Sequence, residues 1–168
     1  DSVIPNGIYN MHPINSYANP TIASDGERII ASFMNYGVVS YDLDGNKLWE
    51  FPHEIIPDFY GGSCSPIIWD SIAIVKIDSD DDPRIMAFDC LTGDSVWSLR
   101  PSDNEWSYFG SNSTLIIWNN LLVNHGSKFL VAYDLSEMDV EWWLRIPGNG
   151  VATPVVSNDY LIFNSYVQ

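Results

Sequence analysis

The sequence predicts an all-β fold built from β-propeller blades, each of them a four-stranded antiparallel sheet. A short sequence motif, called the repeated phrase below, runs from an aromatic-Asp pair to a Trp. Its Asp recurs as Asp42, Asp89 and Asp134, so the motif is repeated after 47 and then 45 residues. Short apolar runs between Gly, Asp and Asn fit strands and hairpins, and the aromatic content of 14% favours strands. We expect about three and a half blades, as part of a larger propeller of about seven or eight.

The repeated phrase marks the end of each blade, where an Asp precedes a turn and a Trp follows it. Its recurring positions are Asp42 and Trp49 in the first unit, Asp89, Gly93 and Trp97 in the second, and Asp134 and Trp142 in the third. Asp44-Gly45 and Thr92-Gly93 are hairpin signals, because Gly reaches positive φ without a Cβ penalty. In the third unit Glu137-Met138 replaces Thr-Gly.

A second phrase, rich in Pro and hydroxyl residues, precedes each of these and marks a fourth unit. It reads Asn19-Pro20-Thr21-Ile22, Ser65-Pro66-Ile67-Ile68, Ser113-Thr114-Leu115-Ile116 and Thr153-Pro154-Val155-Val156. Pro is tolerated at the first residue of a strand, so we expect these segments to enter the first strand of each blade. The units then cover about residues 19–52, 65–100, 112–147 and 152–168 of a single domain, 1–168.

The second unit shows the expected blade most clearly. Its strands are expected at residues 67–69, 72–77, 84–89 and 95–99, and no segment has the apolar period of a helix. The fourth unit has room for two strands, at 155–157 and 160–164. Such an incomplete sheet predicts a fragment of a longer chain, or a ring that the rest of the propeller or a second copy closes.

The phrase from Ala87 to Trp97 resembles the end of a blade in the PQQ-like (quinoprotein alcohol dehydrogenase-like) propeller repeat, Ala-x-Asp-x-x-Thr-Gly-x-x-x-Trp. The third unit keeps Ala132 and Asp134, and the first has a turn shorter by one residue. The resemblance implies that the three Trp residues dock one blade against the next. It also implies a secreted, periplasmic or cell-envelope location. The fold hosts enzymes, assembly factors and binding scaffolds, so it does not fix an activity.

The charge of the chain excludes several classes of partner. Seven Lys and Arg stand against 22 Asp and Glu, a formal net charge of −15. Nucleic acids and anionic membrane surfaces need basic residues, so neither is expected as a partner. No stretch is long and apolar enough to span a membrane. The acidity favours solubility, with a cation or a basic partner as the alternatives.

The densest group of oxygen ligands is the run that contains Asp78, Asp80, Asp81 and Asp82. Calcium prefers several carboxylates and carbonyls at one place, so this run is the best metal candidate. It lacks EF-hand spacing and lies between two expected strands, which favours a solvated hairpin tip. Calcium at these four residues remains the alternative.

The other candidate groups favour packing over chemistry. Cys64 and Cys90 match no zinc spacing and are expected as buried thiols, with a disulfide as the alternative. His12, His53 and His125 are scattered and are expected as packing or surface residues. Aromatic platforms for a sugar or quinone would need Trp69, Trp106, Trp118 or Trp143 to converge, which spacing does not show.

Two functions follow from the resemblance. The favoured one is a non-catalytic scaffold that binds a protein, peptide or saccharide. The alternative is part of a dehydrogenase that uses pyrroloquinoline quinone (PQQ) and calcium. Many alcohol dehydrogenases of the family have two adjacent cysteines near the quinone, whereas Cys64 and Cys90 are 26 residues apart. No catalytic residue is carried over, and with few basic residues we expect no tight binding of PQQ.

Overall fold

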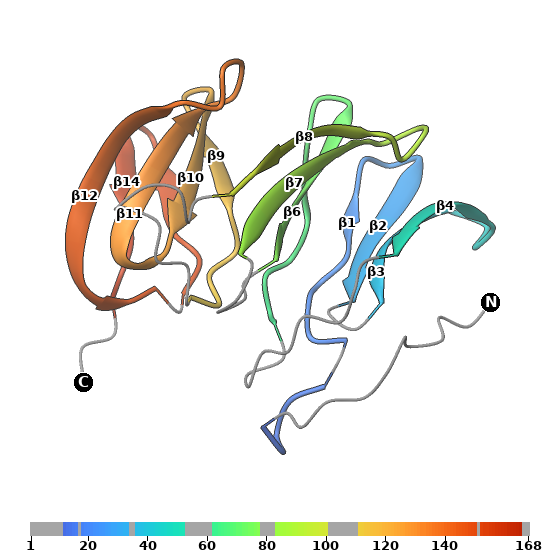
Figure 1. Ribbon diagram of the computed structural model, residues 1–168, viewed down its shortest axis with the longest axis horizontal. Helices are drawn as coiled ribbons and strands as arrows, with labels where there is room; N and C mark the ends of the chain where they lie inside the picture. The colour runs from blue at the N-terminus through green and yellow to red at the C-terminus, as the bar shows by residue number, and fades with distance from the viewer. Residues whose placement is uncertain are drawn as a thin grey trace.

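The computed structural model describes residues 12–16, 18–33, 36–52, 62–77, 83–100, 111–150 and 152–165. These residues form strands and turns, arranged as sheets that lie side by side (Figure 1). Three sheets have four strands each and the fourth has two, and every pairing is antiparallel. The predicted all-β propeller fold is therefore confirmed. Within the described part of the chain no helix is long and apolar enough to cross a membrane.

Each four-stranded sheet runs along the chain without a crossover. The first contains β1 (Ala23–Ser24), β2 (Arg28–Phe33), β3 (Gly37–Asp42) and β4 (Lys47–Pro52). The second contains β5 (Ile67–Trp69), β6 (Ile72–Ile77), β7 (Arg84–Asp89) and β8 (Ser95–Leu99). The third contains β9 (Ile116–Trp118), β10 (Leu121–His125), β11 (Ser127–Asp134) and β12 (Val140–Asn149), and the fourth β13 (Val155–Ser157) and β14 (Tyr160–Ile162).

The four strands expected in the second unit have the bounds that the sequence predicted. In the fourth unit β14 ends at Ile162, two residues before the expected end at Asn164. Turns separate β5 from β6 and β7 from β8, and Gly93 takes the positive φ of 76° that its hairpin requires.

The second phrase was placed out of register in two units, by two residues in the first and by one residue in the third. Second strands begin at Arg28, Ile72, Leu121 and Tyr160, and a hydroxyl residue lies seven positions before each of them. The equivalent residues are therefore Thr21, Ser65, Thr114 and Thr153. Pro66 and Pro154 follow the hydroxyl residue, whereas Pro20 precedes it, so Pro20 is not a strand-entry proline.

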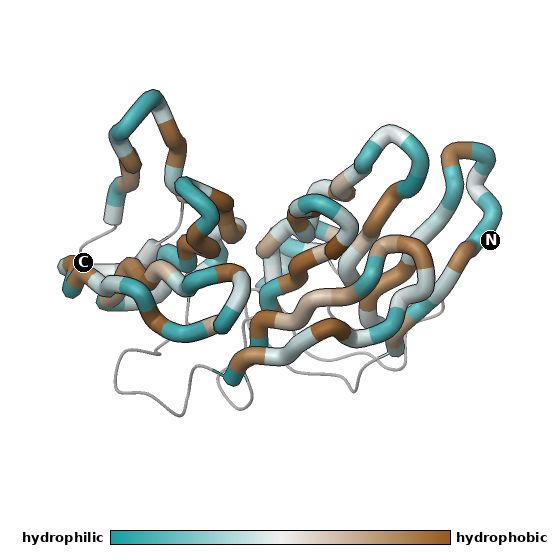
Figure 2. Tube along the Cα trace, turned by 90° about the horizontal axis from the view of Figure 1, so that it is seen from above, coloured by the Kyte–Doolittle hydropathy of each residue, from teal (hydrophilic) through white to brown (hydrophobic). Residues whose placement is uncertain are grey.

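The core lies between neighbouring sheets rather than inside any one of them. One cluster joins the first and second sheets, through residues such as Ile30 and Phe88. A second joins the second and third sheets, and a third joins the third sheet to β14 through Leu161. Figure 2 shows hydrophobic stretches along the strands and hydrophilic ones at the turns. The sheets thus depend on their neighbours for burial, as in other repeat architectures.

Candidate functional site

The Asp of the repeated phrase organises the turn that follows it. In the second sheet the Asp89 Oδ1 accepts hydrogen bonds from the backbone N–H groups of Leu91 and Thr92, each at 2.8 Å. The Thr92 N–H is the largest cause of a pKa of Asp89 below its ordinary value. This Asp is an anionic cap for its own turn.

The first and third units use the same device with different donors. Asp42 accepts from the backbone N and the side-chain Nδ2 of Asn46, both at 2.8 Å. Asp134 accepts from the backbone N–H groups of Ser136 and Glu137, at 2.8 and 3.0 Å. Hydrogen bonds from the side chains of Asn46 and Ser136, respectively, are the main reason why the pKa values of both carboxyls are lowered.

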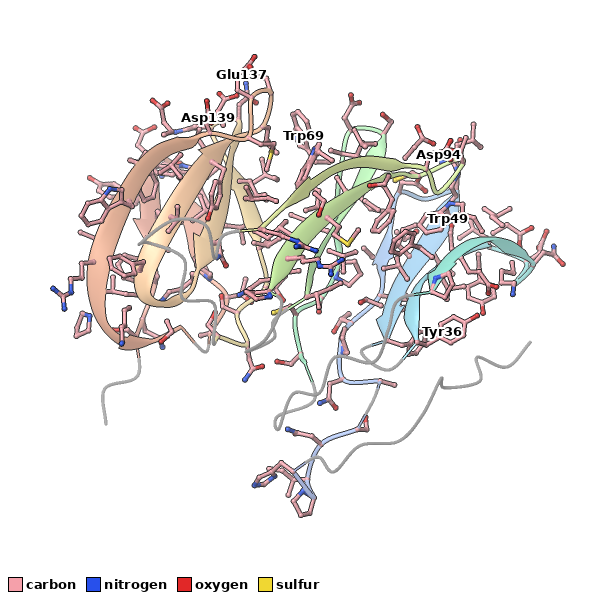
Figure 3. All side chains as sticks on the ribbon, viewed as in Figure 1. Tyr36, Trp49, Trp69, Asp94, Glu137 and Asp139 are labelled. Carbon is pink, nitrogen blue, oxygen red and sulfur yellow. The ribbon has the colours of Figure 1, made fainter. Side chains whose placement is uncertain are left out.

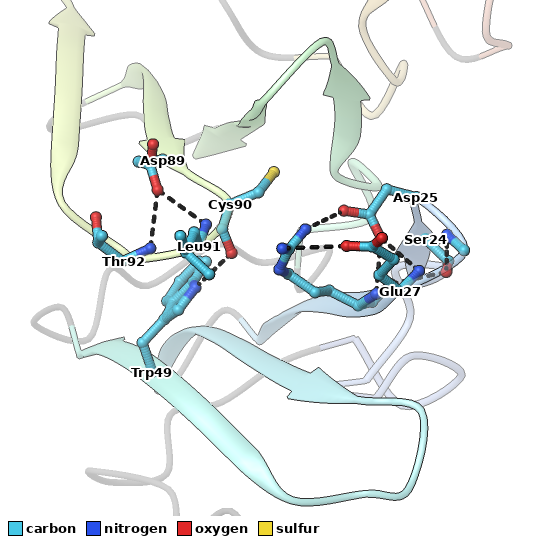
Figure 4. A network of polar contacts seen from close by, with 10 residues as sticks. Ser24, Asp25, Glu27, Trp49, Asp89, Cys90, Leu91 and Thr92 are labelled. Atoms are coloured by element: carbon cyan, nitrogen blue, oxygen red, sulfur yellow. Dashed lines mark hydrogen bonds and ion pairs between the residues drawn. The ribbon is translucent and has the colours of Figure 1, made fainter.

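Trp49 docks the first sheet on the turn of the second (Figure 4). Its indole Nε1 donates to the carbonyl oxygen of Cys90 at 2.9 Å, and 8% of the residue is exposed. The ring lies 6.0 Å from that of Phe88 and covers Gly93, where an added Cβ would come within 2.6 Å of the Trp49 Cδ2. The glycine of one phrase therefore makes room for the tryptophan of the phrase before it.

The second and third docking tryptophans are half-buried. Trp97 belongs to the cluster between the second and third sheets, which also contains Met138. Met138 occupies the position of Gly93 in the third turn and has a positive φ of 59°. Trp142 packs edge to face on Trp118, with ring centroids 6.4 Å apart. The three positions recur, but only Trp49 among them is buried.

Hydroxyl residues at equivalent positions link successive sheets, and we call this series the hydroxyl ladder: Thr21, Ser65, Thr114 and Thr153. The Thr21 N–H donates to the Ser65 Oγ at 2.9 Å, and the Ser65 N–H donates to the Thr114 Oγ1 at 3.0 Å. The Thr114 N–H donates to the Thr153 Oγ1 at 3.3 Å. Sequence reasoning missed the ladder, although its signal was present as a hydroxyl residue seven positions before each second strand.

Buried polar side chains occupy a second recurring position, the fifth residue of β6 and of β10. Lys76 is 2% exposed, and its Nζ donates to the carbonyl oxygen and the Oγ of Ser111, at 3.1 and 3.0 Å. The Ser111 hydroxyl donates to the carbonyl oxygen of His125. The His125 ring lies against Gly150, where an added Cβ would approach the ring to 2.6 Å. These contacts join the second unit to the third.

His125 is a packing histidine in this arrangement. Its Nδ1 lies 3.3 Å from the carbonyl oxygen of Ala152, and its ring meets that of Phe163 edge to face. Burial is the main cause of a pKa below the ordinary value of 6.5, and the charge of Lys76 lowers it further. The neutral ring then donates through Nδ1, while its Nε2 is buried without a hydrogen-bond partner.

Both cysteines are buried and neither is in a disulfide. The Cys64 Sγ donates to the carbonyl oxygen of Ser113 at 3.3 Å. Burial raises the pKa of the Cys90 thiol to about 11. A thiol with so high a pKa is a poor nucleophile, because the thiolate is the reactive form.

The candidate calcium residues Asp78, Asp80, Asp81 and Asp82 lie outside the described residues, between β6 and β7. His53 and Trp106 lie outside them too. Among the residues that the structure describes, no three His, Cys, Asp or Glu side chains gather as a metal site would require. The calcium hypothesis stays a prediction.

Carboxylates of the hairpin turns gather at one end of the sheets. Asp94 of the β7–β8 turn and Glu137 and Asp139 of the β11–β12 turn lie there, as does Trp69 (Figure 3). We call this end the turn face. It is formed by the hairpins that join the first to the second strand and the third to the fourth strand of each sheet.

The sequence matches no family model, and no similar protein was found among the curated proteins compared with it. Solved structures do resemble the chain. BamB from Moraxella catarrhalis superposes with a TM-score of 0.67 at 12% identity, over 88% of this chain and 41% of BamB. A europium-containing methanol dehydrogenase superposes with a TM-score of 0.57 at 13% identity, over 74% of this chain and 31% of the enzyme.

A computationally designed protein of similar length gives a TM-score of 0.64 at 13% identity, over 95% of this chain and 92% of the design. The chain thus spans less than half of the two natural proteins, and nearly all of the designed one. At these identities the likeness shows the fold alone, and that fold is the PQQ-like β-propeller expected from the repeated phrase.

Proposed function

We propose that the chain is a non-catalytic propeller scaffold whose turn face binds a protein or peptide. One observation carries the proposal: the β3–β4 and β7–β8 turns present Leu43 and Leu91, which are 60% and 66% exposed. The fold does not use these side chains, unlike the capping aspartates next to them. Apolar side chains held on rigid turns are suited to recognition, since little conformational entropy is lost on binding.

The charge of the turn face indicates the kind of ligand. Asp42 and Asp89 are held ionised by their own turns, and Asp94 and Glu137 stand on the same face. A polypeptide with basic and apolar side chains complements such a surface. A saccharide is the other ligand class that the resemblance allows. Its implied location, secreted, periplasmic or in the cell envelope, is part of the same proposal.

The alternative function, a dehydrogenase with PQQ, requires cationic groups that converge on the quinone carboxylates. Three of the seven Lys and Arg residues are engaged elsewhere. Arg28 pairs with Asp25 at 2.8 Å, Lys47 pairs with Glu50 at 2.7 Å, and Lys76 is buried at a blade interface. Each of these three cations is held locally in a different part of the fold. We therefore propose that PQQ is not a cofactor of this chain.

Peptide selection on the immobilised full chain tests the proposed function. We expect selected peptides to be basic and apolar, and to bind about tenfold more weakly to a variant with Leu43→Ser and Leu91→Ser. Leu48→Ser is the control, because Leu48 is 45% exposed on β4, outside the turns. Selected peptides that bind the turn variant and the wild type equally would contradict the proposal. A glycan panel on the same chain tests the saccharide alternative.

Titrations separate the scaffold from the dehydrogenase. We expect no submicromolar binding of PQQ and no redox activity towards alcohols, with or without calcium. Calcium at millimolar concentration should change the melting temperature little, because the acidic run is expected as a solvated hairpin tip. A genuine site with calcium at 100 times its Kd would instead add about 2.7 kcal/mol. A rise of several degrees that Asp80→Asn with Asp81→Asn abolishes would show a calcium site instead.

A further inference from the structure

The tryptophans that dock neighbouring sheets are seated differently at the first and second interfaces. Trp49 and Trp97 are each the third residue of an outer strand, β4 and β8. Trp49 is buried, and its indole N–H donates to the carbonyl oxygen of Cys90. Trp97 is half-buried, and its N–H bonds to no described residue, not even to Leu135, the equivalent of Cys90. Both interfaces lie between complete four-stranded sheets, so the difference belongs to the repeats themselves.

The turn residue beneath each indole explains the difference. Gly93 leaves room for Trp49, and an added Cβ there would come within 2.6 Å of the ring. Met138 has the position of Gly93 in the third sheet, and it packs in the same cluster as Trp97. Its φ of 59° is one that residues other than Gly rarely adopt. Because Met138 has a side chain where Gly93 has none, the indole of Trp97 cannot seat as deeply as that of Trp49.

A second indole and two carboxylates accompany Trp97 and Met138. Trp69 belongs to the same cluster, and it lies at the turn face with Glu137 and Asp139 (Figure 3). Both carboxylates are exposed, and neither pairs with a cation among the described residues. An indole face attracts a cation, and unpaired carboxylates at the same place add to that attraction. We call Trp69, Trp97, Met138, Glu137 and Asp139 the aromatic-acidic surface.

We propose that the aromatic-acidic surface binds an arginine side chain of the peptide that the turn face recognises. This inference rests on the proposed function and names the residue that anchors its ligand. The guanidinium stacks on an indole face, and its N–H groups donate to the carboxylates of Glu137 and Asp139. Its aliphatic stem contacts Met138, whose flexible thioether adapts to the shape of a ligand.

The chemistry of the surface favours arginine over other ligands that stack on indoles. A lysine ammonium is a strongly hydrated point charge, whereas the planar guanidinium can stack and donate to two carboxylates at once. A neutral saccharide also stacks on indoles. The two unpaired carboxylates and the net charge of −15 favour a cation over such a neutral ligand.

A short peptide with one arginine between two leucines tests the proposal on the full chain. We expect saturable binding by fluorescence anisotropy of the labelled peptide. Binding should be at least about tenfold weaker when citrulline, which keeps the shape but not the charge, replaces the arginine. The chain has seven tryptophans, whose indole N–H signals can be followed in proton–nitrogen correlation spectra. The Trp97 signal, assigned with Trp97→Phe, should shift on titration, whereas that of the buried Trp49 should not.

Met138→Gly tests whether the exposed seat of the indole matters. Gly suits a positive φ, so the variant should fold, and Trp97 can then seat as Trp49 does. We expect at least about fivefold weaker binding of the arginine peptide, and a Trp97 indole signal that indicates a new hydrogen bond. Met138→Leu is the control, because it keeps a large side chain at this position. It should change the affinity by less than about twofold.

Neutralising the carboxylates tests the charge. Glu137→Gln with Asp139→Asn should weaken the arginine peptide by about tenfold, because it removes both acceptors of the guanidinium. Asp44→Asn with Asp159→Asn is the matched control, since it removes the same charge from exposed turns of the first and fourth sheets. The control should change the affinity by less than about twofold.

Equal binding of the arginine and citrulline peptides, or equal effects of the two charge variants, would overturn the proposal. So would an unchanged affinity of Met138→Gly, or a glycan that shifts the Trp97 signal when the arginine peptide does not. If peptides selected on the turn face depend on Leu43 and Leu91 but not on arginine, only this inference fails. If no peptide binds the turn face, the proposed function fails with it.

Discussion

Replacing Gly93 by Ala tests whether a tryptophan of one blade and a glycine of the next form a single docking device. Gly93 and Gly45 both stand in hairpin turns with positive φ, of 76° and 86°. An added Cβ at Gly45 meets nothing within 4 Å, whereas at Gly93 it meets the Trp49 ring at 2.6 Å. The two glycines thus share a left-handed backbone conformation, but only Gly93 lies in contact with the Trp49 ring.

The expected loss in free energy of unfolding has two parts, the strain of a left-handed backbone and the overpacking against the Trp49 ring. An L-residue in the left-handed region costs about 1 to 2 kcal/mol, which is the whole expected cost of Gly45→Ala. Gly93→Ala adds an overpacking cost of about 1 to 3 kcal/mol, because the Trp49 indole is held by its hydrogen bond to the Cys90 carbonyl oxygen and by its contact with Phe88. Its total cost should therefore be about 2 to 5 kcal/mol.

Denaturant unfolding of the full chain measures the free energy of unfolding for each variant. The excess cost of Gly93→Ala over Gly45→Ala should disappear in a Trp49→Leu background, since the smaller side chain leaves room for the Cβ. A double-mutant cycle isolates this coupling. Equal costs of the two glycine substitutions, or an excess that persists without the indole, would refute the docking device.

Three further predictions concern the ladder, the buried histidine and the turn caps. Thr114→Val should lower the free energy of unfolding by about 1 kcal/mol in denaturant melts, because it leaves the Ser65 N–H without its acceptor, while Thr114→Ser should not. The pKa of His125 is lowered in the folded state, so the unfolded chain takes up the proton first and stability should fall as the pH drops below 6.5. His125→Asn should remove that fall in thermal melts between pH 7 and 5. Asp89→Ala should lower the melting temperature more than Asp44→Ala, and the difference should vanish as the pH falls through the lowered pKa of Asp89.

The strands could be predicted from the sequence where turn chemistry is explicit. Asp89 and Gly93 mark a hairpin by composition, so the strands on both sides were predicted with their observed bounds. The capping bonds of Asp89 span two and three residues, and such local contacts are visible in a sequence. The docking role of the tryptophans was predicted from the family resemblance. The resemblance did not predict that only Trp49 of the three is buried.

Contacts between blades could not be predicted, because they join residues far apart in the chain. Lys76 and Ser111 are 35 residues apart, and the ladder bond from Ser65 to Thr114 spans 49. In the second phrase, Pro20 was more conspicuous than the hydroxyl of Thr21, and aligning it with Pro66 displaced the register of the first unit by two residues. Hydroxyl residues are common in loops, so only the structure shows that they recur as acceptors.

The blade interfaces differ in how firmly the same positions hold them, and this bears on which part of the fold opens first. Trp49 is buried and hydrogen-bonded at the first interface, whereas Trp97 at the second is half-buried against the cluster that Met138 also contacts. The last sheet has two strands and exposes Ile162. Segments with few buried contacts open first, so within the described fold β13 and β14 should open before the three complete sheets.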